Sequence, residues 1–243
     1  MASIDVLPAA AVTSRTWDEI WGLTQAYYDT DRDYAEGWLR THQRIGLFRS
    51  GDDELVGMAS VDVFTETFRG RRLAVIFTSH VLLREEYRGH NLIQRLGLRV
   101  FLQTRMRYPL RSIYWFFDTF SYKSYLLLAR NLREYWPRHD RPTPDWERGL
   151  MAHLSERTYG ASWQPQQGIV VRSGRKKLRG EAAPLPADLS DAPDLQFYVR
   201  ANPGHAAGDM LVCLCPLSLG NWAGVAWRAL HREFLGAGRR YSG

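Results

Sequence analysis

The chain has 243 residues, 45% of them hydrophobic, which is enough to bury one sizeable core. The formal net charge is +6 and the isoelectric point is about 9.5, which favours an anionic partner: nucleic acid, a phosphorylated cofactor, an acidic carrier protein or a membrane surface. No stretch approaches the roughly 18 apolar residues of a membrane span, and the first residues lack the apolar run of a signal peptide, so we expect a cytoplasmic protein.

The first third of the chain predicts two helices and a β-hairpin. Apolar residues at helical spacing follow Thr16 and Thr30, and each threonine is a candidate N-cap. Residues 43–49 and 54–65 have the composition of strands, and the polar run between them predicts a hairpin turn. A second turn leads to residues 73–83, whose nearly unbroken apolar run predicts a central strand covered on both faces.

The middle of the chain predicts a strand, a helix and a second strand parallel to the first. Residues 91–107 place Leu92, Leu96 and Val100 on one helical face. Residues 112–120 are β-branched and aromatic, so the helix becomes a crossover between parallel or nearly parallel neighbours. A further helix is expected over about 121–132. This order predicts a mixed α/β fold, with a central mixed sheet flanked by helices.

The rest of the chain departs from this alternation. Residues 138–193 predict an insertion with a short helix near 145–159 and a polar, mobile loop rich in proline and glycine. Residues 195–201 and 210–217 are expected to form two antiparallel strands, and an amphipathic helix is expected from Asn221. We assign all of these elements to a single domain over 1–243.

The two cysteines, Cys213 and Cys215, lie one residue apart in an expected strand, which puts both thiols on one face. That spacing does not suit a disulfide framework. No group of cysteine and histidine residues completes a tetrahedral set of metal ligands. We therefore expect paired core thiols and no metal.

One turn joins the central strand to the crossover helix through the sequence REEYRGHNLI, Arg84 to Ile93. A strand that enters a helix through a glycine turn exposes the first free N–H groups of that helix, and the helix dipole adds positive potential. Arg88 adds a charge and Gly89 lacks a Cβ atom. The turn is therefore a candidate seat for an anion.

This stretch resembles the phosphate-binding loop of the GNAT superfamily of N-acetyltransferases, which has the pattern Arg/Gln-x-x-Gly-x-Gly/Ala. The likeness covers about residues 15–135. Asn91 and Ile93 stand where the family has glycines, and the β-branched Ile93 should restrict the approach of a diphosphate. The resemblance implies a GNAT-like sheet and a donor held at the loop, either acyl-CoA or acyl-phosphopantetheine on an acyl carrier protein. The residues expected to bind this donor are Val81, Leu83, Arg88, Gly89, His90, Asn91, Leu92 and Ile93.

Acyl transfer from a thioester to an amine needs a neutral amine, a donor to the thioester oxygen and a proton for the thiolate. The resemblance implies that main-chain amides near Ser79 to Val81 hold the oxygen. His80 is either the proton acceptor or a satisfied core histidine, and a bulge would be needed to re-aim its side chain. Asp118 is either a site residue at the carboxyl edge of the sheet or a helix cap. Glu85 and Glu86 are alternative bases.

Leu127 stands where the family often has a tyrosine that acts as general acid. Tyr122, Tyr125 or Ser121 would have to take that role from another position. The candidate catalytic residues are therefore His80, Ser79, Tyr122 and Asp118.

Two groups of side chains have alternative interpretations. The aromatic residues of the first two helices either pack in the core or, as the resemblance implies, line an acceptor pocket. They are Trp17, Trp21, Tyr27, Tyr28, Tyr34 and Trp38. A basic run either is a solvated loop or grips an acidic partner, and it lacks the interleaved aromatic residues of a nucleic-acid site. It consists of Arg172, Arg175, Lys176, Lys177 and Arg179.

The leading interpretation is a bacterial-type biosynthetic N-acyltransferase that moves an acyl group by direct attack to an amine of a small molecule or peptide. The first alternative is a module that keeps the fold without turnover and binds coenzyme A, a carrier protein or nucleic acid. The second is a carrier-dependent synthase of acylated amino acids or of a modified peptide, in which the insertion meets the carrier.

Overall fold

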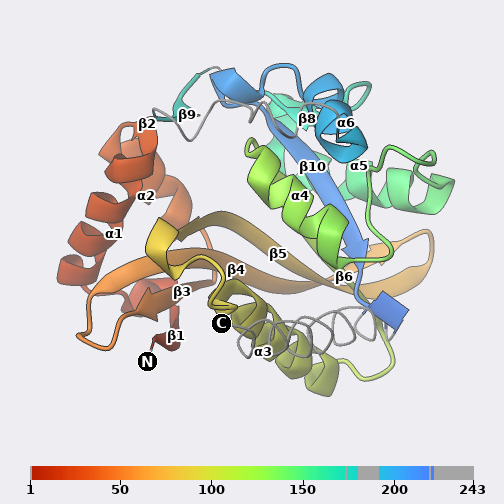
Figure 1. Ribbon diagram of the computed structural model, residues 1–243. Coiled ribbons are helices and arrows are strands. Elements are labelled where there is room, and N and C mark those ends of the chain that lie inside the picture. The colour runs from red at the N-terminus through yellow and green to blue at the C-terminus, as the bar shows by residue number, and fades with distance from the viewer. Residues whose placement is uncertain (1, 173, 180–191, 219, 222–243) are drawn as a thin grey trace, which may run out of the picture.

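The computed structural model describes residues 2–172, 174–179, 192–218 and 220–221. Within these ranges the main sheet has eight strands in the order β1-β3-β4-β5-β6-β10-β8-β7, and β2 pairs with β9 in a separate two-stranded sheet (Figure 1). The strands are β1 Ser3–Pro8, β2 Tyr28–Thr30, β3 Arg44–Arg49, β4 Leu55–Phe68, β5 Arg71–Leu83, β6 Ser112–Thr119, β7 Trp163–Gln164, β8 Ile169–Val170, β9 Lys176–Leu178 and β10 Met210–Pro216.

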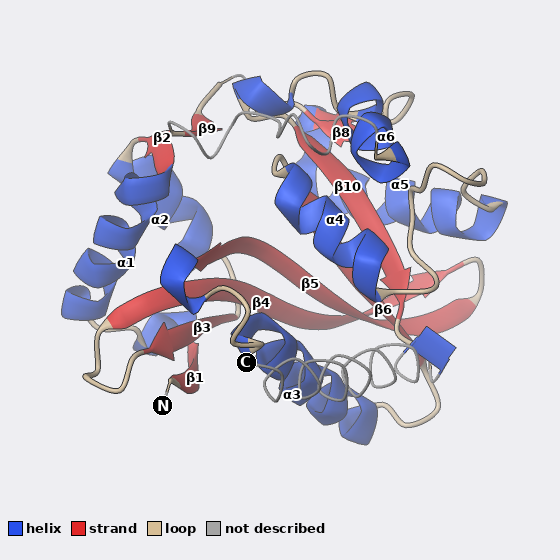
Figure 2. Cartoon of the chain, in the orientation of Figure 1, coloured by secondary structure: helices blue, strands red, loops and turns tan. Residues whose placement is uncertain are grey.

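Helices lie on both faces of the main sheet (Figure 2). They are α1 Ser14–Tyr27, α2 Arg32–Arg40, α3 Leu92–Arg107, α4 Tyr122–Asn131, α5 Asp145–Tyr159 and α6 Pro193–Ala201. Alternation along β5 explains the two layers, because Val75 and Phe77 pack with α1, α2 and α5, whereas Ala74 and Ile76 pack with α3, α4 and α6. A strand that is apolar on both faces is thus buried between two layers of helices.

The crossover predicted for the middle of the chain is confirmed. β5 and β6 are parallel, with pairs from Leu73↔Ser112 to Thr78↔Phe117, and α3 connects them. The other strand pairs that the structure describes are antiparallel. The predicted mixed α/β sheet flanked by helices is therefore present.

Both predicted N-caps are wrong, Thr16 by three residues and Thr30 by one. Thr13 caps α1, because its hydroxyl accepts a hydrogen bond of 3.2 Å from the Thr16 main chain. Asp31 caps α2 through a bond of 2.6 Å from the Tyr34 main chain to its carboxylate. Either side-chain oxygen satisfies an N–H group that the first helical turn leaves free.

The strand predicted over 195–201 is wrong, since these residues belong to α6. Pro193 opens this helix, and Leu195 and Tyr198, three residues apart, bury one helical face beside α4. The strand predicted over 210–217 is confirmed as β10, with Cys213 and Cys215 both fully buried. It pairs with β6 and β8. Apart from Asn221 itself, the final helix expected from that residue lies outside the described residues.

The segment 138–193 contains the helix predicted near 145–159 as α5. It also contains β7 and β8, which extend the main sheet beyond β10, and β9, which pairs with β2. Part of the expected loop, residues 180–191, lies outside the described residues. No helix in the described ranges has the length and the apolar character needed to cross a bilayer.

Candidate functional site

The two parallel strands separate at their carboxyl ends. Their pairing stops at Thr78↔Phe117, although β5 continues to Leu83 and β6 to Thr119. A cavity of about 100 Å³ occupies the place where they part. Its wall comes from the ends of β5 and β6, the first turns of α3 and α4, aromatic residues of β2 and α2, and basic residues before and within β9. Ligand sites of open α/β sheets gather at such carboxyl ends.

The end of β5 carries a β-bulge. His80 and Val81 lie opposite a single residue of β4, Ala59. His80 has a φ of 49°, in the left-handed region that non-glycine residues rarely adopt. The bulge required to re-aim His80 is therefore present, and both bulge residues line the cavity.

Four side chains form a chain of polar contacts at the cavity wall. The hydroxyl of Tyr159 donates to Asp118 Oδ2 at 2.6 Å, and Ser79 Oγ donates to Asp118 Oδ1 at 3.5 Å. Ser79 Oγ also lies 3.2 Å from His80 Nδ1. His80 Nε2 is buried and has no hydrogen-bond partner among the described residues. Asp118 thus contacts Tyr159 and Ser79 and does not cap α4, whose N-cap is Ser121.

Burial sets the protonation of these groups. It lowers the pKa of His80 well below the ordinary value, and the charges of Lys176 and Arg172 act in the same direction. The pKa of Asp118 is raised by burial, although the Tyr159 hydrogen bond and the charge of Arg172 oppose the rise. His80 is therefore neutral near pH 7 and able to accept a proton.

Lys176, in β9, and Arg172, which precedes that strand, line the same cavity. Lys176 is buried, and its Nζ lies 4.0 Å from the ring centroid of Tyr28 and 5.7 Å from that of Phe120. Pairing of β9 with β2 fixes its position, since Lys176 lies opposite Thr30. Burial lowers the pKa of Lys176 to about 7, with the neighbouring guanidinium of Arg172 adding to the effect.

The turn after β5 has the form expected of an anion seat. Gly89 has a φ of +90°, and open space surrounds it, so its backbone conformation accounts for the glycine. Asn91 takes the N-cap position of α3 with a φ of 57° and without a side-chain cap bond. The main-chain N–H of Arg95 is bonded to the Asn91 carbonyl, which leaves the preceding amides of the first turn outside that helical ladder. Arg88 is ion-paired with Glu85.

The structure brings several of the expected donor and catalytic residues together. Ser79, His80, Val81, Asp118 and Ile93 all line the cavity. Leu83 packs in the core, and the segment from Arg88 to Leu92 forms the turn next to the cavity wall without lining it.

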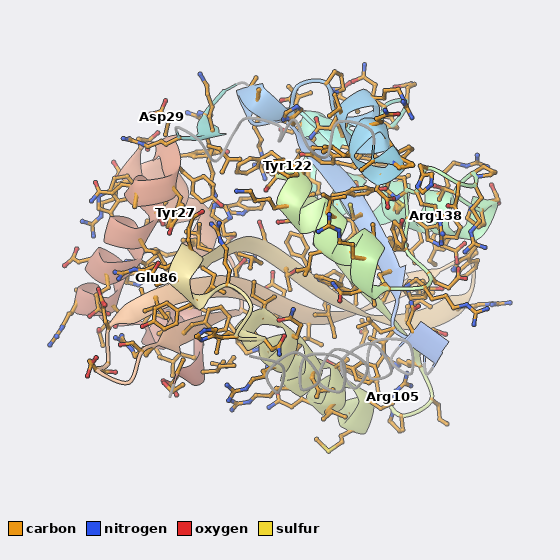
Figure 3. The ribbon with its side chains drawn as sticks, viewed as in Figure 1. Tyr27, Asp29, Glu86, Arg105, Tyr122 and Arg138 are labelled. Carbon is orange, nitrogen blue, oxygen red and sulfur yellow. The ribbon has the colours of Figure 1, made fainter. Side chains whose placement is uncertain are left out.

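The remaining candidates lie elsewhere. Tyr122 is buried at the first turn of α4 in the core on the α3 side of the sheet, and it does not line the cavity (Figure 3). The hydroxyl of Tyr125 donates to the Pro137 carbonyl at 3.0 Å. Glu85 and Glu86 are exposed on the short helix after β5. Leu127 lines the cavity and brings no hydroxyl to it.

Sequence reasoning missed one residue of the site, Tyr159, which it placed in the helix near 145–159 without a role. Of the two interpretations of the basic run, the solvated loop is wrong for Arg172 and Lys176, which line the cavity, and the grip on an acidic partner stays a prediction. Of the aromatic residues in the first two helices, Trp17 is buried in the core, whereas Tyr34 and Trp38 line the cavity, and the acceptor pocket stays a prediction. No group of three or more His, Cys, Asp or Glu side chains in the described ranges could hold a metal ion.

No protein-family model matches the chain, and no curated protein matches it. Among solved structures, a GNAT family N-acetyltransferase from Escherichia coli in complex with CoA is 14% identical and has a TM-score of 0.35. That match covers 48% of this chain and 61% of the other. An acetyltransferase from Trypanosoma brucei is 21% identical over 59% of this chain and 98% of its own, with a TM-score of 0.37.

A protein from Enterococcus faecalis, described as a probable N-acyltransferase, is 12% identical over 89% of this chain and 66% of its own, with a TM-score of 0.42. The likeness is to acetyltransferases and acyltransferases. The chain spans less than two thirds of the matched proteins from E. coli and E. faecalis. At such identities and TM-scores, the likeness transfers no activity to this chain.

Proposed function

We propose that this chain is a GNAT-type N-acyltransferase that moves an acyl group from a thioester to an amine. The observation that carries the proposal is the separation of β5 from β6 at a β-bulge, directly before the exposed N-terminus of α3. A thioester with a phosphate-bearing arm fits this arrangement, because the arm can follow the gap between the strands while its phosphate meets the first amides of α3.

The bulge supplies the group that polarises the thioester. Beyond Thr78 the β5 main chain is no longer paired with β6, so amides near His80 and Val81 that face the cavity are free to donate to a ligand. A fixed N–H donor at that place stabilises the oxyanion that forms during attack. The strained backbone at His80 holds the donor in position.

His80 is the proposed general base. If Nδ1–H donates to Ser79 Oγ, Nε2 carries a free lone pair, and this atom is the proposed acceptor of the proton that the attacking neutral amine loses. Ser79 and Asp118 act as positioning residues, since their contacts fix the imidazole tautomer. Tyr159 in turn holds the carboxylate of Asp118.

Tyr28 is the proposed proton source for the leaving thiolate. It lines the cavity, and burial raises the pKa of its phenol, with the charge of Asp118 adding to the rise and that of Arg88 opposing it. The phenol is therefore protonated and lies in the wall of the cavity that His80 also lines. Burial also raises the pKa of both cysteine thiols, so attack by the amine itself is favoured over a covalent enzyme intermediate.

The donor is either acyl-CoA or an acyl-phosphopantetheine carried by a protein. The donor turn is the turn after β5, Arg84 to Asn91, where the phosphate of the donor would bind. Ile93 lines the cavity next to this turn, and Arg88 is ion-paired with Glu85. The turn should therefore bind a diphosphate more weakly than a glycine loop with an unpaired arginine would. The proposal therefore includes both donors. We also propose that residues 138–193 belong to the same domain as the rest of the chain and that the protein is cytoplasmic.

The proposal is tested by thiol release from acyl-CoAs of rising chain length and from the matching acyl carrier proteins, each with and without a panel of amines. Release that needs an amine is expected. His80→Gln should lower kcat at least a hundredfold, whereas the matched control His153→Gln, on α5 and outside the cavity, should leave kcat unchanged. Absence of amine-dependent release with every donor would remove the enzymatic function.

A binding module without turnover is the second candidate. Leu127 lines the cavity where a tyrosine that acts as general acid is expected, and Ile93 lines it beside the donor turn. Calorimetry with CoA and with nucleic acid separates the two. Nucleic-acid binding that weakens steeply with salt, together with no thioester affinity, would favour the module.

A further inference from the structure

Lys176 and Arg172 form a pair of cationic side chains that the proposed reaction does not use. Both line the cavity that holds His80 and Asp118. Across the described ranges, neither side chain lies within ion-pair distance of a carboxylate, and Lys176 Nζ makes no hydrogen bond. A buried ammonium group without a neighbouring anion lowers the stability of the folded protein, and an anionic ligand that pairs with it removes this cost.

Asp118 does not balance the two cations. Its oxygens are occupied by the Tyr159 and Ser79 hydroxyl groups, and its single negative charge faces the charge of Arg172 and that of Lys176, which is partly protonated at its pKa of about 7. Neither Tyr28 nor His80 in the same wall adds a negative charge at neutral pH, because burial raises the phenol pKa of Tyr28 and lowers the pKa of His80. The cavity therefore has an excess of positive charge.

The guanidinium of Arg172 is held ready for a planar anion. Its Cζ lies 4.7 Å from the Trp38 ring centroid and 5.5 Å from that of Tyr159, and its Nη1 donates to the Tyr34 hydroxyl at 3.4 Å. Contact with both rings and the bond to Tyr34 restrict the movement of the guanidinium and leave its remaining N–H groups for a partner. A group immobilised in advance loses less entropy when it binds a ligand.

We propose that Lys176 and Arg172 bind the carboxylate of the acceptor, so that the acceptor is an amino acid. This inference rests on the proposed acyl transfer and names the class of its acceptor. The carboxylate lies between the two cations, and the α-amino group of the same molecule points toward His80 across the cavity. Charge-assisted hydrogen bonds from both cations to one carboxylate give the acceptor its position and orientation.

The reaction then balances without a further reagent. The neutral amine attacks the thioester carbonyl, a C–N bond forms, and the C–S bond breaks. His80 receives the proton that the amine nitrogen loses, and the thiolate receives a proton from Tyr28. Loss of the His80 proton to solvent and uptake of one proton by the Tyr28 phenolate restore both groups. The products are an N-acyl amino acid and the free thiol of the donor. Lys176 is a binding residue in this scheme, and no proton passes through it.

Matched acceptors test the inference in the wild-type protein. Leucine, leucinamide and 3-methylbutylamine, with the corresponding tyrosine and glycine series, differ in the carboxylate. We expect kcat/KM for the amino acid to exceed that for its amide and its amine at least tenfold. The amide has the more acidic ammonium group and so offers more neutral amine, which makes a preference for the amino acid a demanding result.

Lys176→Met keeps the apolar stem and removes the ammonium group. We expect a KM for amino acids at least tenfold higher, a kcat within threefold of wild type, and little change with amides. The matched control is Lys177→Met, the next residue of β9, whose side chain points to the opposite face of that strand. Arg172→Gln should raise the same KM, and Lys176→Arg should restore part of the affinity.

Four outcomes overturn the inference. Equal use of amino acids and decarboxylated amines would reject carboxylate binding and leave the acyltransferase intact. A fall in kcat at constant KM in Lys176→Met would make Lys176 a proton-transfer residue instead. Calorimetric titration of the protein with leucine and with leucinamide needs no turnover. Equal heats from both ligands, or binding that Lys176→Met does not weaken, would reject the site even if the proposed activity failed.

Discussion

The Tyr159 hydroxyl donates a hydrogen bond of 2.6 Å to Asp118 Oδ2 and so connects helix α5 to the end of strand β6. This contact joins the segment 138–193 to the strand that forms one wall of the cavity. It also holds a carboxylate whose pKa burial raises, because the bond favours the ionised form. The stability of the cavity wall and the charge of Asp118 therefore depend on the same hydroxyl group.

Tyr159→Phe should lower the free energy of unfolding by about 1–3 kcal/mol, the usual effect of removing one partner from a hydrogen bond to a buried charged group. Without the bond the pKa of Asp118 rises further, so the acidic limb of the kcat/KM profile should move to higher pH. Urea unfolding and the pH profile measure these effects. Tyr108→Phe is the control, because the Tyr108 hydroxyl makes no hydrogen bond within the part of the chain that the structure describes. An unchanged acidic limb would separate Asp118 from the reaction.

Lys176 should make the stability depend on pH. Its pKa is depressed from 10.5 to about 7 by burial, so between these values the unfolded chain binds more protons than the folded one. Above pH 10.5 the buried amino group is neutral in both states and does not reduce the free energy of unfolding. As the pH falls from 10.5 to about 7, the cost of keeping it neutral in the folded state grows, and stability is lost. Between pH 7 and 9 the wild type should gain about 2 kcal/mol relative to Lys176→Met. Urea unfolding of both proteins at the two pH values measures the gain, and parallel pH curves would contradict it.

The ion pair between Arg88 and Glu85 should weaken donor binding. Glu85→Gln releases the guanidinium and should lower the Kd for CoA a few-fold at low salt, in line with the roughly 0.2–1 kcal/mol of an exposed ion pair. Arg88→Ala should raise the Kd. Calorimetry at two salt concentrations measures both changes, with Glu86→Gln on the same turn as the control. A Kd that is indifferent to both Glu85 and Arg88 would place the phosphate elsewhere.

Gly208 should fix the position of strand β9. A Cβ atom at this residue would lie 2.0 Å from the Lys176 carbonyl oxygen, and its φ of +94° strains any L side chain. Gly208→Ala should therefore displace Lys176, lower the free energy of unfolding by about 1–3 kcal/mol and raise the KM of the acceptor.

The control for Gly208→Ala is Gly97→Ala on α3, where the added carbon would meet no described residue within 4 Å outside its own stretch of helix. A mid-helix glycine replaced by alanine should stabilise the protein by roughly 0.5–1 kcal/mol. Urea unfolding and acceptor titration compare the two variants. Equal behaviour would show that the close approach of Gly208 to β9 has no bearing on the site.

The sequence alone determined the crossover of β5, α3 and β6. These elements are buried, so each leaves a local pattern in the sequence: an apolar run, apolar residues at helical spacing, and a β-branched and aromatic run. It also placed the candidate anion seat at Arg88 and Gly89. The sequence pattern gave the wrong prediction for residues 195–201. Their aromatic and β-branched composition suits a strand, whereas packing against α4 favours a helix.

The tertiary structure decided the chemistry of the cavity. The bulge at His80 depends on the register that β4 adopts beside β5, and the position of Lys176 depends on the pairing of β9 with β2. Tyr159 reaches Asp118 only because α5 packs against the sheet. These contacts join segments far apart in the chain, and a local periodicity carries no information about which distant backbone will lie beside it.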